Sequence, residues 1–267
     1  MGALIEVLDT ERVRYLTLNR ADRFNALNSA VLTELRELIV DAAADESVGC
    51  LVIRGAGDRA FCAGADLDEL RGLTIEAAHA FIRRGQQTMA AVEASPVPVL
   101  AAVDGYALGG GLELMLACHL VVASDRSSFG LPEAKIGCQP GFGGTQRLLT
   151  ATGKAPALYL MLTGERVDAR RAWEMGLLSV PPVPPDDLTG TVGGLAQGVA
   201  AGSRGGICNI LEAARRAYAA PALEHEAALA AIAIASPDGQ EGIRAFAERR
   251  PPAFGTGHIK GSTPTTR

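Results

Sequence analysis

A run of three glycines precedes a glutamate near the middle of the chain. Gly109, Gly110 and Gly111 lie where an apolar segment gives way to a helical pattern, and Glu113 follows in the first turn of the predicted helix. Glycines leave backbone N–H groups open to a ligand, and the N–H groups that begin a helix attract negative charge. Such a terminus can hold an oxyanion while a nearby carboxylate moves a proton. Taken alone, Glu113 is also explained as a first-turn glutamate that interacts favourably with the helix dipole.

A second glutamate lies in a segment rich in glycine and proline. Glu133 follows the loop-like residues 129–132 and precedes the glycine-rich run 140–144. A third segment, residues 60–67, consists mostly of small residues after a predicted strand, so few side chains would block its backbone donors. Taken alone, Glu133 is explained as an ordinary loop acid and the third segment as a tight turn. The three segments become informative about function because all of them occur, in this order, in one chain.

Strand-like and helix-like segments alternate along the first two thirds of the chain. Short apolar or alternating segments predict strands, and amphipathic segments between them predict helices. Strands that alternate with helices in this way are typical of α/β proteins with mostly parallel pairing. The predicted strands are 13–18, 48–54, 99–103 and 119–123, and the predicted helices are 31–44, 74–93 and one that begins at the glycines 109–111.

The proline-rich segment 181–185 predicts a stiff connector to a region with a different pattern. Residues 255–267 are rich in Gly, Thr and Ser and have no apolar period, which predicts a disordered tail. We therefore expect an α/β core over residues 1–195, a C-terminal helical lobe over 196–255 and a tail over 256–267. The lobe is expected because apolar residues recur at helical spacing in 187–201, 207–219, 222–235 and 240–249.

Composition narrows the function classes. The chain has 267 residues, 48% of them hydrophobic, which is enough to bury a full core. Its net charge of -5 and its lack of long like-charge runs argue against a nucleic-acid partner. Five cysteines without a CxxC pair predict reduced thiols and neither a disulfide framework nor a zinc site. Because no signal segment or 18-residue apolar run is found, we expect a soluble, cytoplasmic protein without a membrane partner.

Three segments carry a family resemblance. FCAGADL at residues 61–67, DGYALGGGLEL at 104–114 and FGLPEAKIGCQPGFGGTQRL at 129–148 resemble the signature segments of the enoyl-CoA hydratase/isomerase (crotonase) superfamily. The resemblance extends over roughly residues 5–255, including 18–27, 162–182 and 237–251. A set of ordered segments is far more specific than one short motif. It implies an α/β fold with a crotonase-like spiral core of repeated ββα units and a C-terminal helical lobe.

The resemblance also implies a mechanism. In the family, two backbone N–H groups hold the carbonyl oxygen of an acyl-CoA thioester, and these match Ala63 and Gly110. The family's hydratases use two glutamates, which fall on Glu113 and Glu133; both position the water, and Glu133 exchanges the proton at C2. Since isomerases of the family often lack an acid at the first position, Glu113 favours hydration of an enoyl-CoA.

The same resemblance implies how the substrate is held. CoA is part of the substrate, so no separate cofactor and no metal is expected, and family members form homotrimers or homohexamers. Arg23 suits a phosphate because its guanidinium is always charged, although a solvated surface arginine is an equally good explanation. The residues expected along the substrate are Arg23, Ala26, Ala63, Gly64, Ala65, Asp66, Leu67, Gly109 and Gly110.

The sequence is compatible with more than one activity. The same oxyanion hole supports double-bond isomerisation, decarboxylation and thioester hydrolysis in the family, and a catalytically silent CoA-binding protein is the alternative of another class. Residues 55–60 also match a dinucleotide fingerprint in form. His119, where the family commonly has an acid, and Cys138, where small aliphatic residues are usual, depart from the family pattern. Neither the acyl chain nor the pathway follows from these residues.

Overall fold

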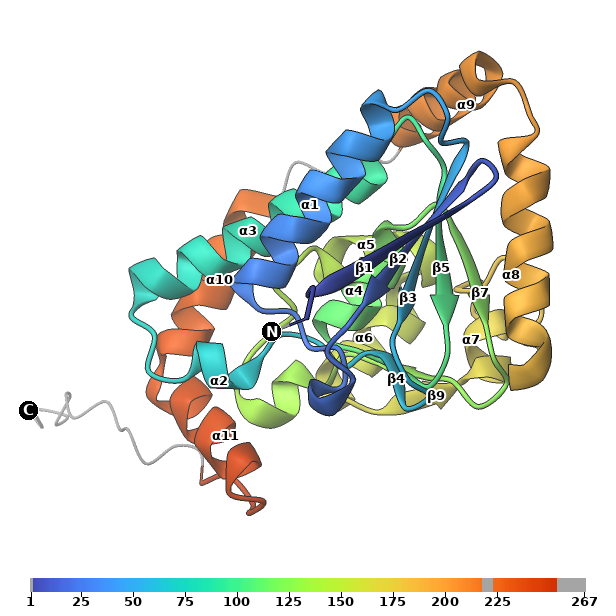
Figure 1. Ribbon diagram of the computed structural model, residues 1–267. Helices are drawn as coiled ribbons and strands as arrows, with labels where there is room; N and C mark the ends of the chain where they lie inside the picture. The colour runs from blue at the N-terminus through green and yellow to red at the C-terminus, as the bar shows by residue number, and fades with distance from the viewer. Residues whose placement is uncertain (1, 218–222, 254–267) are drawn as a thin grey trace, which may run out of the picture.

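The larger of two sheets carries the predicted parallel strands. The computed structural model describes residues 2–217 and 223–253, and its largest sheet has the strand order β1-β2-β3-β5-β7 (Figure 1). Only the first pair, β1 with β2, is antiparallel; β2, β3, β5 and β7 run parallel to their neighbours. The strands are β1 Ile5–Thr10, β2 Val13–Leu18, β3 Cys50–Gly55, β5 Val99–Val103 and β7 Leu120–Ala123.

A second sheet of short strands lies beside the ends of the first. It has the order β4-β6-β8-β9, in which β9 is antiparallel to β8. After β3 and again after β5, the chain passes to a short strand and then to a helix: β3, β4 and α2, then β5, β6 and α4. This repeat of ββα units confirms the predicted spiral α/β fold. The short strands are β4 Ala60–Cys62, β6 Tyr106–Leu108, β8 Ser128–Gly130 and β9 Arg166–Asp168.

Helices cover both faces of the large sheet. α1 (Ser29–Ala44), α3 (Ile75–Glu93) and α10 (Leu223–Ala235) pack together on one side, and α8 (Pro185–Ala200) stands along the other (Figure 1). Successive side chains of a strand point to opposite faces. In β3, Leu51 and Ile53 therefore belong to the main core, whereas Cys50 and Val52 pack against α8.

The remaining helices connect the sheets and form the C-terminal region. They are α2 Leu67–Leu70, α4 Gly110–Ala117, α5 Gly144–Thr152, α6 Lys154–Thr163, α7 Ala169–Glu174, α9 Arg204–Ala217 and α11 Pro237–Ala247, with short 3-10 helices η1 Ala21–Arg23 and η2 Pro132–Ile136. Among the described residues, no helix combines the length and apolarity needed to cross a membrane.

The sequence predicted most of the long elements and missed most of the short ones. The predicted strand 99–103 is β5, and the predicted helix 74–93 is α3. The Thr74 side chain caps this helix by accepting a hydrogen bond from the N–H of Ala77. The strand β1 and the whole second sheet were not predicted. Helices α9, α10 and α11 are the expected C-terminal helices. The division into core and lobe stays a prediction. The predicted tail lies outside the described residues.

Candidate active site

The carboxylate of Glu113 is buried and held by backbone N–H groups. Gly109 precedes α4 with φ 51° and ψ -127°, a conformation that glycine adopts without steric cost. Glu113, only 2% exposed, lies in the first turn of that helix. Its Oε1 accepts hydrogen bonds from the N–H of Phe142 (2.8 Å) and of Gly144 (2.7 Å), the residue at which α5 begins. The N-terminus of α5 thus faces a carboxylate carried by α4.

Glu133 approaches the glycines that precede Glu113. It belongs to the short helix η2, which follows β8, and its Oε2 is buried. Its Oε1 lies 3.0 Å from the position that a Cβ on Gly109 would occupy. The structure therefore brings both predicted carboxylates to the N-terminal end of α4.

The third predicted segment runs beside the same glycines. A Cβ on Gly64, which has a φ of 110°, would lie 3.3 Å from the nitrogen of Gly110. On its other side the segment forms an isolated parallel bridge, in which the N–H of Leu27 donates to Gly64 O and the N–H of Asp66 donates to Leu27 O. All three segments that carried the resemblance meet at the start of α4.

The direction of the backbone N–H groups corrects one predicted role. The N–H of Ala63 donates to Phe24 O at 3.0 Å, so this group serves the fold and does not face a ligand. In the bridge between Leu27 and Ala65, the bonds are made by the residues on either side of Ala65, which turns its own N–H to the opposite face. A Cβ on Gly110 would lie 3.4 Å from that nitrogen. The geometry thus favours Ala65 over Ala63 as the partner of Gly110.

The chain is similar to known proteins over most of its length. The model of the family described as enoyl-CoA hydratase/isomerase matches residues 9–257. The chain belongs to this family.

Relatives within the family resemble it over nearly their whole length. The chain is 40% identical to a probable enoyl-CoA hydratase, echA8, of Mycobacterium tuberculosis, covering 91% of this chain and 95% of the relative. It is 40% identical to the 2,3-dehydroadipyl-CoA hydratase of Escherichia coli, with the same two coverages. A solved enoyl-CoA hydratase from Mycobacterium avium subsp. paratuberculosis superposes with a TM-score of 0.86 at 32% identity, covering 95% of this chain and 99% of the other.

Several residues predicted to lie along CoA form one cluster, held by an arginine that the prediction omitted. Arg20 pairs with Asp66 at 2.7 Å and also donates to the carbonyl oxygen of Ala26 at 2.6 Å. Asp66 in turn accepts the N–H of Asp68 at the start of α2, the helix that begins at Leu67. Arg20 lies in the N-terminal segment 18–27 that carried part of the resemblance, and its place in that segment was the signal available for it.

Arg23 lies apart from this cluster. Its guanidinium pairs with Asp68 at 2.8 Å, and both side chains are more than half exposed. A phosphate could approach Arg23 from solvent, but the ion pair would compete with it, and an exposed pair of this kind contributes little to stability. The structure thus leaves the predicted phosphate contact as a prediction.

The two departures from the family pattern have structural contacts. The Nδ1 atom of His119 accepts the N–H of Val99 at 2.9 Å, and burial lowers the pKa of the imidazole. The N–H of Cys138 donates to Glu133 O at 2.9 Å. Burial, together with the Glu133 charge, raises the pKa of the Cys138 thiol to about 12, so it is a protonated, small apolar side chain near neutral pH.

The dinucleotide fingerprint is excluded by its surroundings. Residues 55–60 connect β3 to the strand β4, whereas a phosphate-binding turn of this type leads into a helix. A Cβ on Gly55 would lie 2.4 Å from Ala60 O, so the loop is packed against its own backbone.

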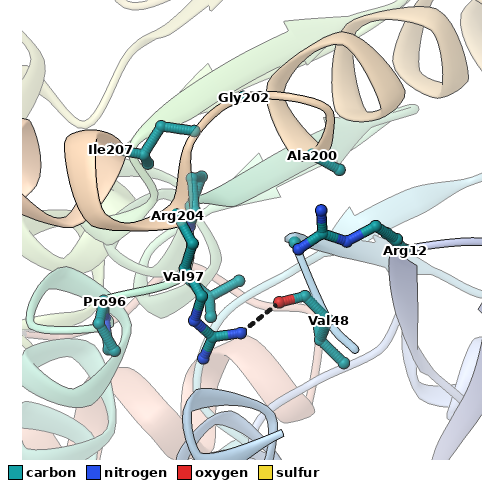
Figure 2. A pocket seen from close by; sticks show the side chains of 10 residues that line it. Arg12, Val48, Pro96, Val97, Ala200, Gly202, Arg204 and Ile207 are labelled. Carbon is teal, nitrogen blue, oxygen red and sulfur yellow. Dashed lines mark hydrogen bonds between the residues drawn. The ribbon is translucent and has the colours of Figure 1, made fainter. Parts of the chain in front are cut away.

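Two cavities lie elsewhere in the molecule, and neither is lined by Glu113 or Glu133. Figure 2 shows the first, which is lined by residues such as Val48, Val97 and Ala200 and in which Arg204 donates to the carbonyl oxygen of Val48 at 2.9 Å. The second is bounded by residues of the large sheet, such as Tyr15 and Arg54, and by residues of α8. The two carboxylates and the backbone donors around α4 thus lie outside both cavities.

Proposed function

We propose that this chain is an enoyl-CoA hydratase, which adds water reversibly across the 2,3 double bond of an enoyl-CoA thioester. The observation that carries the proposal is the meeting of two carboxylates, Glu113 and Glu133, with a helix start built from glycines. The relatives named above include hydratases of CoA thioesters, which supports the same substrate class for this chain.

The N–H groups of Gly110 and Ala65 hold the thioester oxygen in this proposal. When water adds at C3, negative charge builds up on that oxygen as an enolate, and preorganised donors stabilise it more than they stabilise the substrate. Gly110 is the first residue of α4, so the helix dipole adds to the effect. Loss of one such donor typically costs about 3 kcal/mol of transition-state stabilisation.

The two glutamates handle the protons. Both accept hydrogen bonds from the attacking water; Glu133 takes its proton as the hydroxyl group bonds to C3 and passes that proton to C2 when the enolate collapses. The reverse reaction removes the C2 proton and expels the hydroxyl group. Glu113 is suited to bind water as an anion, because two N–H donors stabilise its charged form.

The rest of the substrate and the assembly follow from the family. In this proposal the CoA portion lies along Ala26 and residues 64–67, with Arg23 near its phosphates, and the reaction needs no metal and no further cofactor. A homotrimer or homohexamer in the cytoplasm is proposed on the same ground.

Hydration of crotonyl-CoA, followed as loss of the enoyl-thioester absorbance, tests the proposal. We expect the wild type to be active and both Glu113→Gln and Glu133→Gln to lose at least about a hundredfold in kcat, as is usual for a positioned acid or base. Glu165→Gln is the matched control, because this glutamate is exposed and pairs with Lys135 on the surface. An inert wild type that still binds acyl-CoA, or one that only moves the double bond, would overturn hydration in favour of another reaction of the family.

A further inference from the structure

Hydrogen bonds hold both of the peptide groups that meet at Phe142. Its N–H donates to Glu113 Oε1 at 2.8 Å, and its carbonyl oxygen accepts a hydrogen bond from Arg147 Nη1 at 2.9 Å. Another donor to Glu113, the N–H of Gly144, lies two residues further on. The peptide group that joins Phe142 to Gly143 lies between the two peptide groups that supply these N–H donors, so holding its carbonyl oxygen limits the directions in which the donors can point.

Arg147 is well placed to do so. It lies in the first turns of α5, and its side chain is only 10% exposed. Its Nη2 donates to Glu93 Oε2 at 2.7 Å, so one guanidinium joins a backbone carbonyl to a carboxylate. Its Nε is buried and finds no hydrogen-bond partner among the described residues, a cost that the two charge-assisted bonds have to offset.

The carboxylate that receives Arg147 is itself anchored. Glu93 is the last residue of α3, and its backbone oxygen lies 3.3 Å from His119 Nε2. Because Nδ1 of His119 accepts the N–H of Val99, the ring proton is on Nε2, which donates to Glu93 O. His119 thus ties the end of α3 to the first residue of β5, so that Glu93 offers Arg147 a fixed partner.

We propose that Arg147 is a positioning residue for the hydratase reaction: it holds the peptide group between Phe142 and Gly143, so that the N–H donors of the two neighbouring peptide groups, those of Phe142 and Gly144, face Glu113. The inference rests on the proposed function, since it assigns Arg147 to the machinery of that reaction. Arg147 does not touch the reacting atoms in this arrangement. Its effect passes through the backbone of residues 142–144 to the carboxylate that binds the water.

An arginine is required at residue 147 because two acceptors have to be bonded by two separate donor nitrogens of one side chain. The carbonyl of Phe142 and the carboxylate of Glu93 are bonded by different nitrogens of one planar group, which a lysine ammonium on a flexible stem cannot reproduce. In Arg147→Met the side chain keeps similar length and apolar volume but loses both bonds. In Glu93→Gln the acceptor for Arg147 Nη2 becomes neutral, whereas the bond from Arg147 to the carbonyl oxygen of Phe142 remains possible.

The test compares Arg147→Met, Arg147→Lys and Glu93→Gln with Arg204→Met as the matched control. Arg204 is also partly buried and also donates to backbone carbonyls, but at the end of α1. With crotonyl-CoA we expect kcat of Arg147→Met to fall on the order of tenfold to a hundredfold while KM changes little. Arg147→Lys should not restore it, and Glu93→Gln should lose less.

Two further readouts separate positioning from general destabilisation. A carboxylate that loses N–H donors holds its proton more tightly, so the acid limb of the kcat/KM profile, which belongs to Glu113 and Glu133 together, should move to higher pH in Arg147→Met. Amide hydrogen exchange in residues 140–146 should also become faster. Arg204→Met should lose stability but keep the wild-type kcat, pH profile and exchange in this segment.

The inference is overturned if Arg147→Met behaves like Arg204→Met, or if its kcat falls without a change in the acid limb and in exchange at 140–146. Failure of the proposed function gives a different result. An inactive wild type in which Arg147→Met still speeds exchange at 140–146 would reject the hydratase reaction while keeping the role of Arg147 toward Glu113.

Discussion

Oε1 of Glu133 lies 3.0 Å from the point where a Cβ on Gly109 would stand. That carboxylate therefore occupies space that exists only because residue 109 has no side chain. The same glycine has a φ of 51° with a ψ of -127°, which other residues adopt only at a cost. One position thus serves both the turn into α4 and the placement of Glu133.

Gly109→Ala should consequently damage activity more than stability. The added methyl group has to displace the Glu133 carboxylate, and the backbone conformation costs about 1–3 kcal/mol in addition. We expect kcat with crotonyl-CoA to fall at least about a hundredfold, and urea unfolding to register the backbone cost. Gly72→Ala is the control, since Gly72 has a φ of 73° and nothing within 4 Å of its added Cβ. Equal kcat values for the two variants would contradict the steric argument.

Gly144→Ala separates the placement of Glu113 from backbone strain. A Cβ at residue 144 would lie 2.9 Å from Glu113 Oε1, yet Gly144 lies in helix α5, where alanine is the more favourable residue by up to about 1 kcal/mol. The variant should therefore keep a melting temperature near that of the wild type and lose at least about tenfold in kcat. Gly190→Ala in α8, whose Cβ would meet nothing within 4 Å, should keep the wild-type kcat and melt no lower than the wild type.

The sequence alone was enough to predict that the glycines and the two glutamates of the site lie close together. Long apolar segments such as 99–103 reveal strands by their pattern alone, and a parallel sheet brings the ends of such strands together. The glycines before Glu113 marked the start of α4, and the order of the three segments pointed to one site. These features depend on local residue type and on spacing along the chain.

Other features depend on contacts between distant residues. Strands of three residues, such as β4 and β6, have no readable period, so the second sheet was missed. The choice between Ala63 and Ala65 depends on a single bridge to Leu27, which no local pattern reveals. The pair of Arg147 with Glu93 likewise joins residues 54 positions apart. From the sequence, an arginine in a helix would be predicted to lie exposed on the surface.

Arg204 offers a prediction on stability alone. Its guanidinium donates to the carbonyl oxygens of Ala43 and Asp45, at the end of α1 where helix carbonyls lack partners, and to that of Val48 in the segment that follows. Arg204→Gln should lower the free energy of unfolding by about 2 kcal/mol, the usual scale for hydrogen bonds to a charged group. Urea denaturation measures this, and Arg170→Gln, at a side chain that is 87% exposed, should stay within about 0.5 kcal/mol of the wild type. Equal losses in the two variants would refute the role of the three carbonyls.

His119 should make stability depend on pH. Burial lowers the pKa of its imidazole, which the bond to the Glu93 backbone and the Glu93 charge only partly oppose. The unfolded chain therefore binds a proton at a higher pH than the native one, so the contribution of His119 is complete above the unfolded pKa of about 6.5. It declines as the pH falls from there toward the lower native pKa, by at most about 1.4 kcal/mol per pH unit.

His119→Asn isolates this contribution. Asparagine does not titrate, and its side-chain oxygen can still accept the N–H of Val99, the bond that Nδ1 accepts in the wild type. We expect the free energy of unfolding of the wild type to fall more steeply between pH 7 and pH 5 than that of the variant, so that the two curves approach each other at low pH. Urea titrations at several pH values in that interval measure both curves. Parallel curves would mean that native His119 takes up its proton as readily as the unfolded chain does, and that its burial does not control this part of the pH dependence.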